Sequence, residues 1–149
     1  MQAATTALAL LVAACGSDPA DRAVAEQRGP LAIIESTGVT SLDAIGGTGP
    51  INIGERCVTV PLNSSPSKEL LLIWRSAEVV WEDGQITFTS RSVNDPKPVT
   101  IRNGDEITVG GEYFETEGEA ERIVDWVAEP HESCNGDQYI VNSVTQQGS

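Results

Sequence analysis

The residues of this sequence with the clearest chemical potential are the carboxylates of one acidic segment. Residues 105 to 137 contain eleven acidic side chains and a single basic one, Arg122. Hard cations such as Ca²⁺ take about six to eight oxygen ligands. Four closely spaced glutamates could supply some of these ligands: Glu112, Glu115, Glu117 and Glu119. The spacing of acids in a calcium-binding loop is not matched, so a solvated acidic face is the other interpretation.

Groups suited to covalent or acid–base catalysis are few. The one histidine, His131, could serve as a general base, but a histidine in a surface loop is the simpler interpretation. No second histidine exists to complete a zinc-protease motif, and no Gly-x-Ser-x-Gly sequence occurs. Seven aromatic residues are few for the cleft of a glycosidase. We therefore expect no enzyme activity and no cofactor.

Trp81 is the candidate ligand-binding residue among the aromatic side chains. It lies beside a turn at Asp83-Gly84, where its ring could be exposed as a stacking platform for a sugar or a peptide. Packing in the core is the alternative, as we expect for Trp74 and Trp126.

The charge of the chain excludes one class of partner. The 149 residues include 9 basic and 22 acidic side chains, which gives a formal net charge of −13. A phosphate backbone requires a basic face, so we expect no binding of nucleic acid. The length is that of one domain.

The elements that must position these residues begin after a leader without charged side chains. The run from Ala7 to Ala14 is apolar and ends in small residues, which is typical of a secretory signal and too short to span a bilayer. Val12-Ala13-Ala14-Cys15-Gly16 resembles the lipobox of bacterial lipoproteins, although the leader lacks the Lys or Arg with which such signals usually begin. The resemblance implies that Cys15 is acylated after cleavage and anchors the protein on the extracytoplasmic side of a membrane, in the cell envelope.

Two of the three cysteines remain once Cys15 is acylated. Outside the cytosol Cys57 and Cys134 should then pair, since neither has the closely spaced ligands of a metal site. A disulfide across 77 positions is worth about 4.5 kcal/mol at most in the chain-entropy model. We expect a signal peptide over residues 1–14, a lipid-anchored and largely flexible tether over 15–50, and a disulfide-stapled β domain over 51–149.

Short apolar runs separated by glycine turns predict the fold of that domain. Strands are expected at residues 57–60, 70–74, 79–81, 86–89, 99–101, 107–109 and 139–141, the last with Val144 beyond it. Asp83-Gly84, Asn103-Gly104 and Asn135-Gly136 are typical turn pairs. A helical period over Gly118–Val127 predicts one short helix. The pattern is that of a mainly β protein, and the order of elements resembles the small antiparallel barrel of the OB-fold; a β-sandwich is the alternative.

These expectations together point to a membrane-anchored, extracytoplasmic, non-enzymatic binding or interaction module. Its partner would be an envelope protein or an extracellular ligand, in addition to the membrane reached through the lipid on Cys15. If the barrel is OB-like, the face with Trp81, Ile86 and Phe88 is the surface to examine. A cation- or solute-binding accessory protein that uses the acidic residues 105–137 is the alternative.

Overall fold

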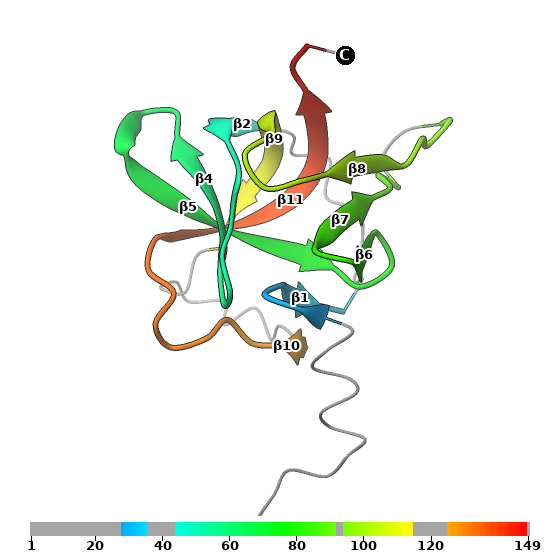
Figure 1. The fold of residues 1–149 in the computed structure, drawn as a ribbon, viewed down its shortest axis with the longest axis horizontal. Helices are drawn as coiled ribbons and strands as arrows, with labels where there is room; N and C mark the ends of the chain where they lie inside the picture. The colour runs from blue at the N-terminus through cyan, green and yellow to red at the C-terminus, as the bar shows by residue number, and fades with distance from the viewer. Residues whose placement is uncertain (1–27, 36–43, 92–93, 115–124, 149) are drawn as a thin grey trace, which may run out of the picture.

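The fold was obtained as a computed structural model, which describes residues 28–35, 44–91, 94–114 and 125–148 (Figure 1). The leader, Cys15 and most of the expected helix lie outside these residues. The eleven regular elements of the described part are all β-strands, which confirms the mainly β class.

Five strands form a closed barrel, in which each strand pairs with two of the others. They are β2 (Ala44–Pro50), β4 (Val58–Leu62), β5 (Ser65–Arg75), β9 (Glu106–Tyr113) and β11 (Asp137–Gln146). Around the barrel the order is β2-β4-β5-β11-β9, and β9 pairs with β2 to close it. The contact between β5 and β11 is parallel, while the other four are antiparallel. The predicted small barrel is confirmed: it is a closed sheet of five strands that is antiparallel, as expected, except at the contact between β5 and β11.

Short strands extend the barrel sheet at both ends. β1 (Ala32–Ile34) pairs in parallel with β5, and β10 (Trp126–Ala128) pairs with β1. β3 (Asn52–Ile53) pairs with β4. Because Trp126 and Val127 belong to β10, the predicted helix does not reach Val127. Their pairing with β1 overrides the local helical period of the sequence.

A second sheet of three strands lies between β5 and β9 in the chain, and it is found on the right of Figure 1. It consists of β6 (Val79–Glu82), β7 (Gln85–Phe88) and β8 (Val99–Ile101). Its inward side chains share the barrel core: Ile86 and Ile101 are fully buried, and the ring of Phe88 meets that of Trp74 at a centroid distance of 5.7 Å. The expectation of a ligand face at Ile86 and Phe88 was therefore wrong, because both side chains are core.

Side chains along β5 alternate between the inside of the barrel and its outer face, and both sets are packed against other residues. Leu70, Leu72 and Trp74 belong to the main core, whereas Ile73 lies in a second apolar cluster with Ile34 and Ile140. Every residue from Leu70 to Trp74 is buried, as the continuous apolar run predicted. The turn between β6 and β7 also forms as predicted, with φ of 52° at Asp83 and 74° at Gly84.

Two strands lie inside the segment that the sequence assigned to the tether. β1 and β2 both belong to the sheet, so the ordered part begins before residue 51. Glycine makes the pairing of β2 feasible. A Cβ at Gly46 would lie 2.5 Å from the ring of Tyr139, and one at Gly47 would lie 2.7 Å from Val60 Cγ1. The run of glycines that indicated a flexible connector is needed for close packing.

Candidate functional site

Two adjoining hollows lie at the disulfide end of the barrel, on the outer side of β4. The first has a volume of about 400 Å³ and is lined by Asn52, Arg56, Thr59 and Ser133 among others; we call it the Thr59 hollow. The second, the Lys68 hollow, has about 420 Å³ and extends along Pro61 and Lys68. Glu69 and Asn135 line both. Such volumes are in the range of small-ligand sites.

The disulfide joins the two loops that form the walls of the Thr59 hollow. Cys57 and Cys134 are bonded, with their Cα atoms 5.7 Å apart, which confirms the predicted pair. The Cys57 carbonyl accepts a 2.9 Å bond from Gly54 N, and Cys134 N donates a 2.9 Å bond to the His131 carbonyl. These turns fix the backbone on either side of the bridge. Residues 54–57 and residues 131–134 thus each form a tight loop, and the disulfide joins the two loops.

Thr59 has an unusual position for a hydroxyl. Its neighbours Val58 and Val60 point into the core, so Thr59 points to the outer face of β4. The residue is nevertheless only 4% exposed, and its Oγ1 is buried with no hydrogen-bond partner. A buried hydroxyl without a partner costs about 1–3 kcal/mol. Thr59 is one of the residues that line the hollow, and a ligand there could supply the missing bond once the atoms that cover Oγ1 move aside.

The register of the sheet places a second such atom in the same row. Across β3, β4, β5 and β11 the paired residues are Asn52, Thr59, Leu71 and Gln138. The Oε1 atom of Gln138 is also buried and has no hydrogen-bond partner. Buried polar side chains are nearly always satisfied. Two unpartnered atoms in one row distinguish this part of the barrel wall.

Arg56 supplies positive charge at the edge of the Thr59 hollow. Its Nη1 lies 3.0 Å from Nε2 of His131, and it forms no ion pair with any carboxylate that the structure describes. It is exposed, and its sequence neighbour is Glu55. A guanidinium that donates one N–H to an imidazole nitrogen keeps its full charge and most of its N–H donors.

The contacts of His131 determine the role that its ring can have. Arginine only donates, so Nε2 accepts the bond from Arg56. Nδ1 lies 2.7 Å from Ser133 Oγ and 3.1 Å from Ser133 N. The ring is thus bound on both sides, to Arg56 through Nε2 and to Ser133 through Nδ1, and it connects the two loops beside the disulfide.

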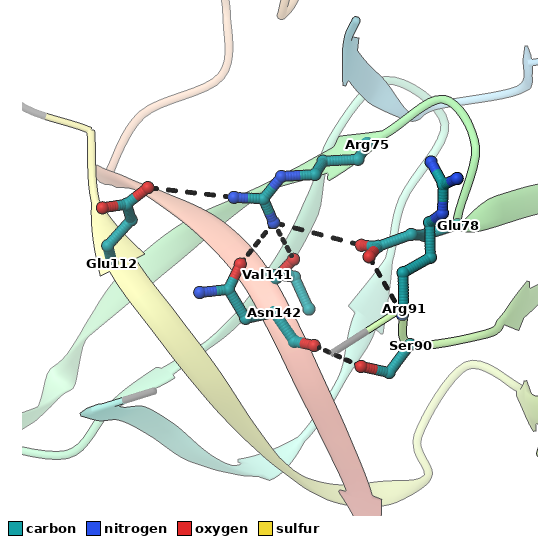
Figure 2. Close-up of polar contacts among 7 residues, drawn as sticks. All are labelled: Arg75, Glu78, Ser90, Arg91, Glu112, Val141 and Asn142. Carbon is teal, nitrogen blue, oxygen red and sulfur yellow. Dashed lines mark hydrogen bonds and ion pairs between the residues drawn. The ribbon is translucent and has the colours of Figure 1, made fainter. Parts of the chain in front are cut away.

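A buried polar cluster forms on the outer side of β5 at the opposite end of this strand (Figure 2). Arg75 lies 3.9 Å from Glu78 and 3.8 Å from Glu112, with all three side chains less than a tenth exposed. Its Nη1 donates to the Val141 carbonyl at 3.0 Å and to Asn142 Oδ1. The cluster links β5, β9 and β11 through one guanidinium.

Two further bonds connect this cluster to the segment that follows β7. The Ser90 hydroxyl donates to the Asn142 carbonyl at 2.9 Å, and Arg91 N donates to Glu78 Oε1 at 3.1 Å (Figure 2). Because its groups bind one another, the cluster has the character of a structural network.

The predicted cation site is placed only in part. Glu112 lies in β9 and pairs with Arg75, while Glu115, Glu117 and Glu119 fall outside the described residues. Within the described ranges no three His, Cys, Asp or Glu side chains lie close enough together to hold a metal ion. A guanidinium beside Glu112 also opposes the approach of a cation.

Trp81 is not an open stacking platform. Its side chain is half-buried against the core, and its ring packs on the backbone of Gly29. It borders a mainly apolar hollow of about 360 Å³ that Leu31, Val80 and Val127 also line.

The sequence analysis did not single out Thr59, Arg56 or Arg75. Thr59 lies in a β-branched run where threonine is an ordinary strand residue. A signal for Arg75 was present, because it directly follows the buried run that ends at Trp74. A cation at the end of such a run requires partners, which only the fold reveals.

Comparison of the chain with protein-family models, with curated proteins and with solved structures gives no match. Among residues 28–35, 44–91, 94–114 and 125–148, no helix has the length and hydropathy to cross a membrane.

Proposed function

We propose that this protein is a membrane-anchored, extracytoplasmic lipoprotein whose folded part is a non-enzymatic binding module. The anchor is the lipid on Cys15, and the barrel presents a ligand site outside the cell membrane. The observation that carries the binding function is the Thr59 hollow, where a ligand could satisfy a buried hydroxyl.

The location in the cell envelope is supported by two features of the chain. The first is the sequence Val12-Ala13-Ala14-Cys15, which resembles a lipobox. The second is the disulfide between Cys57 and Cys134, because disulfides form and persist in oxidising compartments such as the bacterial periplasm and the cell surface.

The binding function is supported by the place of the hollow on the barrel. OB-folds bind ligands on the face of their second and third strands, between the loop that joins strands one and two and the loop that joins strands four and five. In this barrel those strands are β4 and β5, and the two loops carry Arg56 and Ser133. This is an argument from the fold, and the hollow itself supplies the chemistry.

The anchor is tested by lipid labelling of the full chain expressed in a bacterium. We expect radiolabelled palmitate on the wild-type protein and recovery of the protein in the membrane fraction. Cys15→Ala should carry no label and retain its leader, as mass spectrometry would show. Ser17→Ala, which keeps the cysteine two residues away, is the matched control and should behave as wild type. Absence of lipid from the wild-type chain would refute the anchor.

A further inference from the structure

We propose that the Thr59 hollow binds a carboxylate group, which pairs with Arg56 while a neighbouring polar group of the same ligand bonds to Thr59. This inference rests on the proposed binding function and names the chemistry of its ligand. Three observations carry it: the unneutralised charge of Arg56, the buried hydroxyl of Thr59 and the disulfide that fixes the loop between them.

The choice of a carboxylate follows from the partner of Arg56. Two acids, Glu55 and Glu69, line the same hollow, yet neither lies within ion-pair distance of this guanidinium. His131 instead accepts one N–H and holds the group in place without neutralising it. A carboxylate can bind the remaining N–H groups in the two-point geometry that guanidinium favours. The nearby acids weaken the attraction for any anion, and they repel one of higher charge more strongly than a single carboxylate.

The second contact sets what the rest of the ligand must contain. Thr59 Oγ1 can donate one bond and accept others, and it meets no partner on its own chain. Asn52 and Asn135 add amide groups to the same lining. No aromatic side chain is among the described residues that line the hollow, so stacking does not contribute. The ligand is therefore a polar molecule in which a hydroxyl or amide group lies close to the carboxylate.

A sugar acid and the C-terminal end of a peptide share this chemistry, and two pairs of probes separate them. The first pair is galacturonate and galactose. The second is N-acetylglycylglycine and its C-terminal amide. The ¹⁵N-labelled lipidated chain in detergent is titrated with each probe, and the amide resonances of residues 52–59 and 133–135 are followed.

We expect saturable shifts with at least one acid, with a Kd on the order of 1 mM, and at least tenfold weaker binding of its neutral counterpart. Arg56→Gln should weaken binding of the acid by about tenfold, since bonds to charged groups are the stronger ones. Thr59→Val should weaken it by about fivefold without loss of the folded spectrum. Lys97→Gln removes an exposed cation from another part of the molecule and should bind as wild type.

Equal binding of the acid and the neutral probe would overturn the proposal, as would shifts that Arg56→Gln leaves unchanged or the absence of shifts with both acids. These failures would leave the lipid anchor untouched, because that is read from palmitate labelling. Conversion of a probe to a product in the same sample would refute the non-enzymatic function, and the shift data would still report on the carboxylate site.

Discussion

The indole ring of Trp81 lies so close to the backbone of Gly29 that no side chain fits between them. Gly29 has a φ of +52°, and a Cβ built on it would overlap the ring. The contact joins the segment before β1 to the hairpin of β6 and β7. It explains why Trp81 contributes to packing where the sequence also permitted a stacking platform.

Gly29→Ala should therefore lower the free energy of unfolding by more than the cost of placing an alanine in a left-handed backbone conformation, because its Cβ would also overlap the ring of Trp81. A non-glycine residue in that conformation costs about 1–2 kcal/mol. Gly84→Ala is the matched control, because Gly84 also has positive φ, at +74°, and a Cβ there meets nothing within 4 Å. Urea denaturation should show the larger loss at Gly29. Equal losses would mean that the contact with Trp81 adds nothing.

Replacing both Cys57 and Cys134 by alanine should lower the free energy of unfolding by about 2–5 kcal/mol. Without the disulfide, the unfolded chain is no longer closed into a long loop and gains conformational entropy. The measurement is denaturation of the double variant beside the oxidised wild type. A reduced wild-type sample should unfold at the same denaturant concentration as the variant. A variant as stable as the oxidised protein would contradict the prediction.

Arg75→Met should be among the most destabilising substitutions in the barrel wall. It leaves Glu78 and Glu112 buried without their cation, and the loss of one partner from a buried ion pair costs about 3–5 kcal/mol. Adding Glu78→Gln and Glu112→Gln to the same protein removes the two carboxylate charges that Arg75 faces. The triple variant should recover part of the loss in urea denaturation. No recovery would show that the cost comes from lost packing of the long side chain.

Thr59→Val should leave stability unchanged or raise it by up to about 1 kcal/mol, since the valine has nearly the same shape and removes a hydroxyl that has no partner. Thr48→Val offers the comparison, because Thr48 Oγ1 lies 3.2 Å from Thr108 Oγ1 and loses a bond. That variant should lose about 0.5–1.5 kcal/mol. Thermal unfolding of the two variants tests the difference, and a larger loss at Thr59 would refute the unpartnered state.

Millimolar Ca²⁺ should leave the thermal unfolding of the wild-type protein unchanged, because the guanidinium of Arg75 lies beside Glu112. A site at a hundredfold excess of ligand over its Kd would stabilise the fold by about 2.7 kcal/mol. Stabilisation of that size, with none from Mg²⁺ at equal ionic strength, would favour the cation-binding alternative.

Apolar runs and turn pairs were sufficient to predict most strands of the domain. Leu70–Trp74, the Asp83-Gly84 turn and the Cys57–Cys134 pair were each recognisable from local sequence or from cysteine number. In each case the residue types alone, without knowledge of distant contacts, indicate the structure that forms.

The rest depended on contacts that local sequence does not contain. β2 contains glycines because the side chains of Tyr139 and Val60 leave no room for a Cβ there. In local sequence, the same run of glycines indicates a flexible connector. Trp126 joins β10 because β1 lies beside it. The hollow at Thr59 is lined by residues 54–57 and by Ser133 and Asn135, two segments far apart in sequence that the disulfide joins. Its chemistry is a property of that juxtaposition.

The place of β11 also has a consequence for the order in which the barrel is made. β11 lies between β5 and β9, so these strands do not close the sheet until residues 137–146 arrive (Figure 1). The disulfide has the same requirement, since Cys134 directly precedes β11. A chain that emerges with its N-terminus first therefore stays open until its last barrel strand has appeared. If the chain is exported as proposed, this delay keeps it unfolded during passage through a narrow translocation channel and postpones closure and oxidation until after that passage.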